Sequence, residues 1–253
     1  MMVRFKLSRL LAGSALAAGF LVAGAAPAPA ADGTTCSGGS IAGGTYKSLT
    51  VTGFCVIDSG DVNVLHDVTV TSTGALDGMH PGSTLTVGHH LVVGQGGSAL
   101  LGCNSDDSCG GTVSDTIMGN VRSTGAMYLV LHNDAIGGNV SVSGGSAAYD
   151  CSAFAFTDFA FDDISGNVRI TGLRTCWDGL AHNSIDGNVN FDNNVTLIVE
   201  PPPVGADGNE LGDDTIGGNL SCFGNSPTPH LSDAFPMPNR VGGKTRGQCV
   251  GEV

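Results

Sequence analysis

Three pairs of adjacent aspartates are the residues of this chain best suited to acid–base chemistry: Asp106–Asp107, Asp162–Asp163 and Asp213–Asp214. Two carboxyl groups roughly 5 to 10 Å apart can cleave a glycosidic bond, one as general acid and the other as base or nucleophile. The first pair lies between two cysteines, Cys103 and Cys109, in a short segment where its side chains are free to act. The candidate chemistry is therefore hydrolysis of a polysaccharide.

A cluster of aromatic residues is the second candidate site. The stretch YDCSAFAFTDFAF, residues 149–161, contains five of the twelve aromatic residues found beyond position 31. Exposed rings stack on neutral sugars and on protein partners, and the candidates for such a surface are Tyr149, Phe159 and Phe161. Burial is the alternative, because aromatic residues are more often inside a protein. We expect it for Phe154 and Phe156, on one strand face.

The sequence predicts no metal site and no cofactor. It contains eight cysteines, but none forms a Cys-x-x-Cys pair and no histidine lies at ligand spacing from two of them, which argues against zinc. An even number of cysteines in an exported chain indicates disulfide bonds instead.

The aspartates belong to a repeated phrase. Six copies align on a central apolar residue: DTIMGNV, DAIGGNV, DDISGNV, NSIDGNV, DTIGGNL and NRVGGKT. Each has Asp or Asn two positions before that residue and Gly two positions after it. In the first five copies an asparagine follows the glycine: Asn120, Asn139, Asn167, Asn188 and Asn219. Asp162 and Asp214 fill the repeated acidic position, which favours a structural role as turn caps over catalysis.

The spacing of the copies predicts the fold. They lie 19, 28, 21, 31 and 25 residues apart, and apolar residues alternate with polar ones inside each copy. Alternation is typical of strands, and three short strands fit a coil of roughly 19–21 residues. We therefore predict an all-β, right-handed parallel β-helix. Gly-Asn should form a corner with positive φ, and stacked asparagine amides should form a hydrogen-bonded ladder.

We expect one β-helix domain over residues 31–253, with insertions near 147–161 and 199–212 and a C-terminal cap near 223–253. The second insertion is rich in proline and polar residues, which predicts a mobile surface loop around Asn209. Cysteines one coil apart would stack at about 4.8 Å, within reach of a disulfide. This predicts sequential pairing: Cys36–Cys55, Cys103–Cys109, Cys151–Cys176 and Cys222–Cys249.

Residues 1–30 have the pattern of a secretory signal peptide. Arg4, Lys6 and Arg9 precede a small apolar run of about 17 residues and an Ala-Pro-Ala cleavage site. We expect a secreted protein with no membrane span after cleavage. Losing those three cations changes the net charge from −13 to −16. A chain with this negative charge repels nucleic acid, anionic lipid and polyanionic sugars, so we do not expect these as partners.

The stretches NVSVSGG, NVRITG and DTIGGNLSCFGN resemble uncharacterised secreted bacterial proteins of the right-handed parallel β-helix type. The resemblance covers roughly residues 33–250. It implies the fold, and it carries no catalytic residue with it.

The sequence thus favours a secreted structural, surface or binding module without catalytic activity, whose partner is a neutral polysaccharide or a cell-envelope component. The alternative is a carbohydrate-active enzyme, a glycoside hydrolase or lyase, acting on a neutral or cell-wall polysaccharide. An ice-binding protein is a third reading. It rests on three Thr-x-Thr pairs with uneven spacing: Thr50/Thr52, Thr69/Thr71 and Thr84/Thr86.

Overall fold

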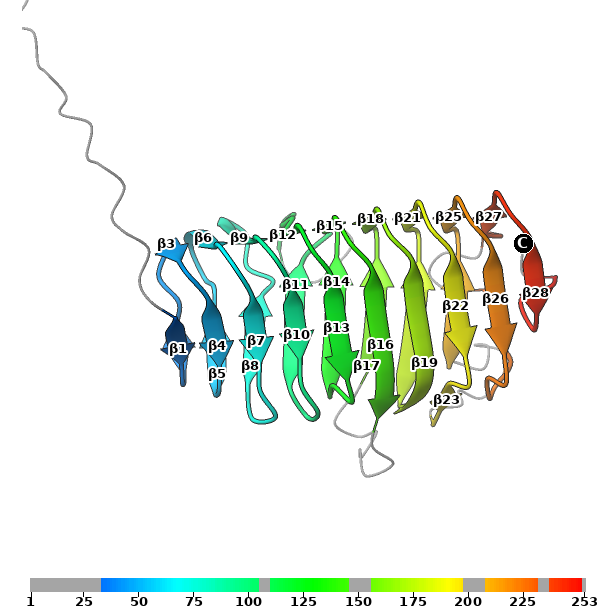
Figure 1. The fold of residues 1–253 in the computed structure, drawn as a ribbon, viewed down its shortest axis with the longest axis horizontal. Coiled ribbons are helices and arrows are strands. Elements are labelled where there is room, and N and C mark those ends of the chain that lie inside the picture. Colours follow the sequence, from blue (N-terminus) through cyan, green and yellow to red (C-terminus); the bar gives the residue numbers. More distant parts are fainter. Residues whose placement is uncertain (1–32, 105–109, 146–155, 198–207, 232–236, 252–253) are drawn as a thin grey trace, which may run out of the picture.

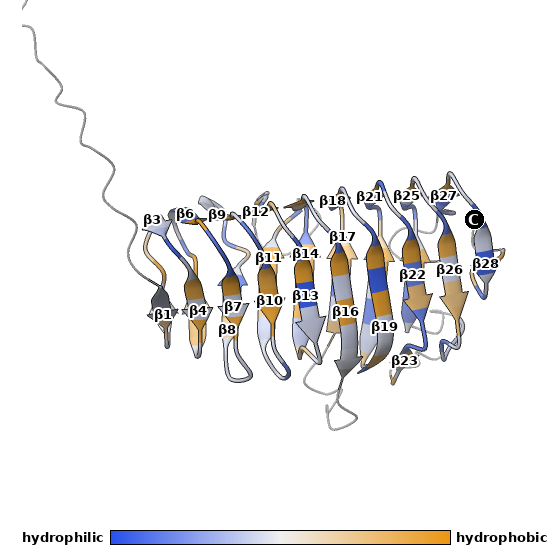
Figure 2. Cartoon of the chain, in the orientation of Figure 1, coloured by the Kyte–Doolittle hydropathy of each residue, from blue (hydrophilic) through white to orange (hydrophobic). Residues whose placement is uncertain are grey.

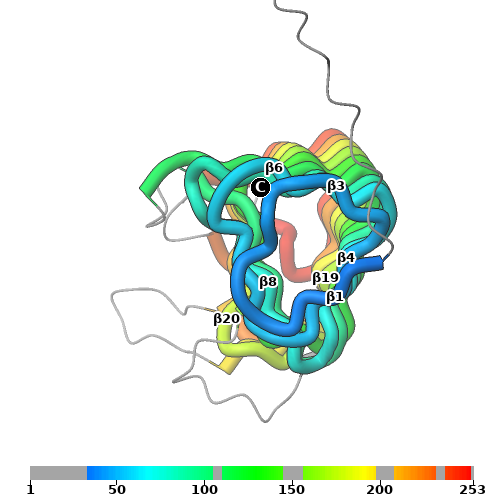
Figure 3. Tube along the Cα trace, turned by 90° about the vertical axis from the view of Figure 1, so that its left-hand side faces the viewer, coloured from blue at the N-terminus to red at the C-terminus, as the bar shows by residue number. Residues whose placement is uncertain are grey.

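The computed structural model describes residues 33–104, 110–145, 156–197, 208–231 and 237–251. Within these ranges the strands pair in parallel with the strands of the next coil, so the chain winds through three sheets (Figure 1). Viewed from the N-terminal end, the path runs clockwise as it recedes, which is the right-handed sense (Figure 3). The predicted right-handed parallel β-helix is confirmed. The described ranges contain no helix of the length and apolarity needed to cross a membrane.

Each sheet takes one strand from almost every coil. Sheet B consists of β1 (Thr34–Cys36), β4 (Leu49–Val51), β7 (Val68–Val70), β10 (Leu91–Val93), β13 (Val121–Thr124), β16 (Val140–Gly145), β19 (Val168–Thr175), β22 (Val189–Asp192), β23 (Val195–Thr196), β26 (Leu220–Phe223) and β28 (Thr245–Gly247). Sheet C consists of β2 (Gly39–Ser40), β5 (Phe54–Val56), β8 (Ala75–Gly78), β11 (Ser98–Gly102), β14 (Tyr128–His132), β17 (Phe156–Ala160), β20 (Trp177–Ala181) and β24 (Asn209–Gly212). Sheet A consists of β3 (Gly44–Tyr46), β6 (Gly60–Val64), β9 (Ser83–Val87), β12 (Thr116–Ile117), β15 (Ala135–Ile136), β18 (Asp163–Ile164), β21 (Ser184–Ile185), β25 (Thr215–Ile216) and β27 (Arg240–Val241).

The core is a set of apolar columns inside the solenoid. The central isoleucines of the repeated phrase stack in register on sheet A, and each is at most 2 % exposed: Ile117, Ile136, Ile164, Ile185 and Ile216. Each such side chain contributes about 1.5–3 kcal/mol through burial. The repeat exists because every coil must offer its neighbours the same apolar surface.

The glycine of the phrase is required for a different reason from the predicted one. It does not have positive φ at Gly138 or Gly218. Instead, a Cβ at Gly138 would lie 2.6 Å from the carbonyl oxygen of Gly119 in the preceding coil, and a Cβ at Gly218 would lie 2.7 Å from that of Gly187. Successive coils therefore approach too closely at this corner for any side chain.

Positive φ occurs elsewhere, one residue before the repeated Asp or Asn. The values are 65° at Asn133, 63° at Phe161, 60° at His182 and 55° at Asp213. In these four coils a left-handed residue other than glycine thus lies between sheets C and A.

Two of the predicted disulfides are confirmed: Cys36–Cys55, with Cα atoms 6.3 Å apart, and Cys222–Cys249, with Cα atoms 5.4 Å apart. Cys103 and Cys176 are also disulfide-bonded. Their predicted partners, Cys109 and Cys151, lie outside the described residues.

The ends of the two predicted insertions belong to regular coils. β17 lies within the range 147–161, and β24 within 199–212. Asn209, predicted to lie in a mobile loop, is completely buried and donates its side-chain N–H to the carbonyl oxygen of Pro227 at 2.6 Å. The predicted cap, 223–253, contains β27 and β28, which add one further strand each to sheets A and B.

Candidate functional site

The repeated acidic position forms a buried ladder that joins the coils. Its six side chains are at most 4 % exposed: Asp115, Asp134, Asp162, Asn183, Asp214 and Asn239. In each step the backbone N–H of one member donates to the Oδ1 atom of the next, for example Asp134 to Asp162 at 2.8 Å and Asp162 to Asn183 at 2.9 Å. These side chains therefore connect neighbouring coils, whereas the sequence predicted turns within one coil.

Burial raises the pKa of the ladder carboxyls. It raises the pKa of Asp115 to about 6, against the hydrogen bonds from the N–H groups of Leu85 and Gly102. The pKa values of Asp134 and Asp162 are raised well above the ordinary range, first by burial and then by the charge of the preceding ladder aspartate. Burial likewise raises the pKa of Asp214. The Oδ2 atoms of these last three have no hydrogen-bond partner and no contact with solvent.

The aspartate pairs do not assemble a hydrolytic site among the described residues. Asp162 faces inward in the ladder, whereas its neighbour Asp163 is exposed on sheet A. Asp214 is likewise in the ladder, and Asp213 accepts hydrogen bonds from His182 and Arg240 at 2.8 and 3.3 Å. Asp106 and Asp107 lie outside the described residues.

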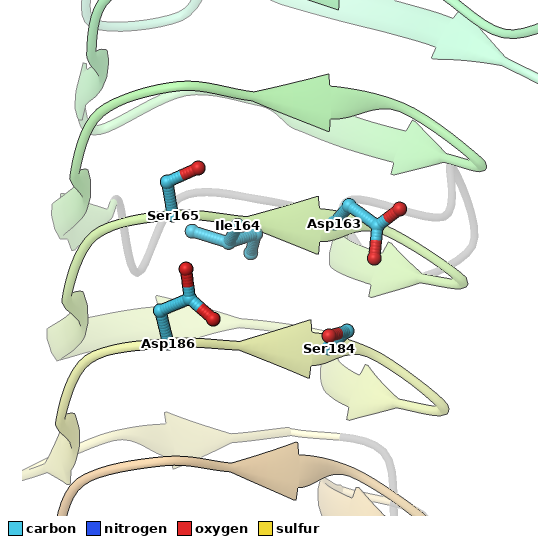
Figure 4. A pocket seen from close by; sticks show the side chains of 5 residues that line it. All are labelled: Asp163, Ile164, Ser165, Ser184 and Asp186. Carbon is cyan, nitrogen blue, oxygen red and sulfur yellow. The ribbon is translucent and has the colours of Figure 1, made fainter.

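A shallow pocket on the outside of sheet A contains Asp163. The carboxyls of Asp163 and Asp186 and the hydroxyls of Ser165 and Ser184 line it, with Ile164 at its floor (Figure 4). The two carboxyls belong to adjacent coils and lie at opposite corners of the pocket. No aromatic side chain lines it, so the pocket offers hydrogen-bond acceptors without a stacking surface.

The five asparagines after the glycines form a second ladder, on the outside. The Oδ1 atom of each of the first four accepts both the backbone and the side-chain N–H of the next asparagine, for example from Asn167 to Asn139 at 2.9 and 3.1 Å and from Asn188 to Asn167 at 2.9 and 2.9 Å. Nδ1 of His90 accepts the N–H of Asn120 at the N-terminal end, and Oδ1 of Asn219 accepts that of Lys244 at the other. The ladder is structural and solvent-exposed.

An aromatic column crosses the outer face of sheet C. Tyr128, Phe156 and Trp177 begin β14, β17 and β20 and stand in register on neighbouring strands. Their ring centroids are 5.5 and 6.0 Å apart, in edge-to-face contact, which is a favourable geometry for aromatic pairs. All three are half-buried, so each keeps part of its ring accessible.

Polar groups lie beside this column. Two residues farther along β14, β17 and β20 the outward positions are Val130, Asp158 and Gly179, and Glu210 of β24 is in register with Gly179. Nε2 of His132 pairs with Oδ2 of Asp158 at 2.8 Å, and the two side chains are 10 % and 15 % exposed. The six-membered ring of Trp177 overhangs Gly179, where a Cβ would lie 2.7 Å from its Cη2 atom. Glycine at this position therefore allows the indole to rest against the strand.

Only part of the predicted aromatic site contributes to this face. Phe159 is completely buried and points into the core, so it is not available as a binding residue. Phe161 lies at a left-handed corner, with its ring 4.6 Å from that of His182. Phe156, predicted to be buried, is on the outer face. Tyr149 and Phe154 lie outside the described residues.

Sequence reasoning did not identify Tyr128 or Trp177, although the signal was present. Each lies six positions before a ladder residue, as does Phe156: Asp134, Asn183 and Asp162, respectively. This fixed offset from the phrase indicates the same place in three successive coils.

Two other site predictions can be placed. Thr50 and Thr69 stand in register on sheet B, but Thr84 and Thr86 lie on β9 of sheet A. The three Thr-x-Thr pairs therefore do not share one face. Among the described residues, no three histidine, cysteine or acidic side chains are grouped so that they could hold a metal ion.

Comparisons with family models, with curated proteins and with solved structures found no match to this chain.

Proposed function

We propose that this protein is an exported, non-catalytic saccharide-binding module whose recognition surface is the outer face of sheet C. The observation that carries the proposal is the column of Tyr128, Phe156 and Trp177 in register on three strands. Saccharide sites combine aromatic surfaces with a few fixed polar groups, and this face has both.

The charge of the face favours a neutral saccharide. Asp158 and Glu210 are the outward carboxyls nearest the column, and because they are only 15 % and 5 % exposed they contribute negative charge to this face rather than direct contacts to a sugar. The same groups would repel an anionic sugar. The rigid β-helix holds the aromatic residues at fixed positions, so little conformational entropy is lost on binding.

The burial of the carboxyls supports binding over hydrolysis. A general acid must reach the glycosidic oxygen within hydrogen-bond distance. Glu210 is only 5 % exposed, and Asp158 is engaged by His132. Tyr128, Phe156 and Trp177 are each more exposed than Glu210.

The test is isothermal titration calorimetry on a panel of neutral polysaccharides, with wild type, Trp177→Ala and Phe223→Ala. Phe223 is a matched control, because it is an aromatic residue 51 % exposed on sheet B, away from the column. Since an aromatic contact contributes roughly 0.5–1.5 kcal/mol beyond its buried area, Trp177→Ala should weaken binding about tenfold, and Phe223→Ala should not. Equal affinity in Trp177→Ala would refute the proposed surface. Cleavage of the polysaccharide by wild type would establish the enzymatic alternative.

A further inference from the structure

Sheet B presents a stripe of arginines and hydrogen-bonding residues on its outer face. One outward position is in register across six consecutive strands, from β13 to β28: Arg122, Ser141, Arg169, Asn190, Ser221 and Arg246. The three arginines are exposed. We call these six residues the basic stripe. Figure 2 shows hydrophilic bands alternating with hydrophobic ones along β19, as expected for a strand with one face outward.

The charge of this face is opposite to that of the chain. The strands of sheet B carry four arginines, the three of the stripe and Arg174, but a single acidic residue, Asp192. The whole chain has only ten basic residues against 23 acidic ones. Within the described ranges, none of the four arginines forms an ion pair. Among the residues that the structure describes, these cations therefore do not neutralise carboxylates of the protein itself.

The surroundings of the stripe suit an extended partner. Strands are about 4.8 Å apart, so Arg122 and Arg169 stand about 10 Å apart along the axis and Arg169 and Arg246 about 14 Å apart. Ser141, Asn190 and Ser221 fill the steps between them with donors and acceptors.

We propose that the basic stripe binds an acidic polysaccharide lying along the solenoid axis, a class of partner that the net charge of the whole chain argues against but the local positive charge of this face favours. The planar guanidinium of arginine matches a carboxylate with two parallel hydrogen bonds, and the intervening serine and asparagine side chains suit sugar hydroxyls. The inference concerns another face than the proposed neutral-saccharide site and does not rest on it.

Two other partners fit the stripe less well. Double-stranded DNA carries one charge per about 1.7 Å of its axis, a density that arginines spaced at about 10 and 14 Å do not match. A second copy of this chain would have to offer a matching acidic row. Its sheet A has acidic outward residues at Asp61 and Asp163, but Arg240 lies in the same outward column as Asp163.

The experiment measures binding of alginate, an unbranched carboxylated polysaccharide, to the full exported chain by biolayer interferometry. The variants are the triple change Arg122→Gln, Arg169→Gln and Arg246→Gln and the control Arg240→Gln, which removes an arginine 66 % exposed on sheet A. The triple change removes three exposed charge contacts, each of modest strength, and should weaken alginate binding about tenfold. Binding should also weaken as salt rises, because screening shortens the range of the interaction. Arg240→Gln and Trp177→Ala should bind alginate as wild type does.

Three results would overturn the inference. One is absence of alginate binding to wild type at low salt, and another is equal affinity in the triple variant with its circular dichroism spectrum unchanged. The third is a preference for another partner: DNA bound more tightly than alginate, or self-association in sedimentation velocity that the triple change abolishes. Because Trp177→Ala is tested alongside, failure here is distinguishable from failure of the neutral-saccharide site.

Discussion

Replacing Asp162 with asparagine should stabilise the protein at neutral pH, because the buried ladder already accepts asparagine. In the next coil Asn183 donates its Nδ2 to the carbonyl oxygen of Phe159 at 2.9 Å. Leu131, one coil earlier, is in register with Phe159. Its carbonyl oxygen is therefore placed to accept the same kind of hydrogen bond from an amide at position 162. The Oδ2 atom of Asp162 has no partner there. Relative to the ionised carboxylate, an amide at this position should gain one buried hydrogen bond, worth about 1 kcal/mol.

The gain should grow with pH. Burial, and then the charge of Asp134, raises the pKa of Asp162 well above 3.8. Between the unfolded and folded pKa values the folded protein binds more protons, so its free energy of unfolding falls as pH rises through that window. Asparagine does not titrate, so the advantage of the variant should widen by about 1.4 kcal/mol per pH unit there. For a domain of this size, each kcal/mol corresponds to about 2–4 °C in Tm.

The assay is thermal unfolding followed by circular dichroism between pH 4 and pH 8, with Asp115→Asn as the control. Both oxygens of Asp115 accept backbone N–H groups, from Leu85 at 2.6 Å and from Gly102 at 3.1 Å. An amide there would direct an N–H at one of these donors and cost about 1–3 kcal/mol. The reasoning is refuted if Asp162→Asn destabilises the protein at pH 7, or if its effect is the same at pH 4 and pH 7.

Other substitutions test the coil contacts. Gly166→Ala should lower the free energy of unfolding, measured by urea titration, by about 1–3 kcal/mol, because its Cβ would meet the carbonyl of Gly138. In the same titration Gly172→Asn should cost much less, because Gly172 has a φ of 65° and there is open space where its Cβ would lie. Asn167→Leu should cost about 1–3 kcal/mol by breaking its hydrogen bonds in the exposed ladder, and a Tm equal to that of wild type would contradict that role. Replacing both Cys36 and Cys55 with serine removes a disulfide that spans 19 residues and should lower the free energy of unfolding by about 3 kcal/mol. The first coil should then be cleaved faster by a protease, and an unchanged rate of cleavage would argue against a stabilising role of this disulfide.

Much of the fold follows from the repeated phrase. Its spacing predicted coil length and parallel stacking, because each coil must present the same surface to the next. Alternation of apolar and polar residues shows that a segment is a strand, but it does not fix which set points inward when aromatic residues occupy both. Phe159, predicted to be an exposed binding residue, points into the core for this reason, and Phe156, predicted to be buried, is half-buried on the outer face.

Other features depend on distances between coils, which one sequence does not display. The glycine at each corner is needed because a neighbouring carbonyl lies close, and the composition of the phrase is equally consistent with positive φ. The buried ladder, in which the carboxyl of Asp162 accepts a hydrogen bond from the adjacent coil, depends on the same distances between coils. The site on sheet C was missed because Tyr128 and Trp177 lie in segments of unrelated sequence, and only their offset from the ladder relates them.

Intrinsic fluorescence tests the proposed recognition surface most directly, because Trp177 is the single tryptophan of the chain. Its emission therefore reports on the aromatic column alone. Titration with the neutral polysaccharide selected by calorimetry should give a saturable change in emission with the same Kd, and Tyr128→Ala should shift both to weaker binding together. Saturable binding by calorimetry with no change in tryptophan emission would show that the saccharide binds elsewhere and would contradict the proposed site.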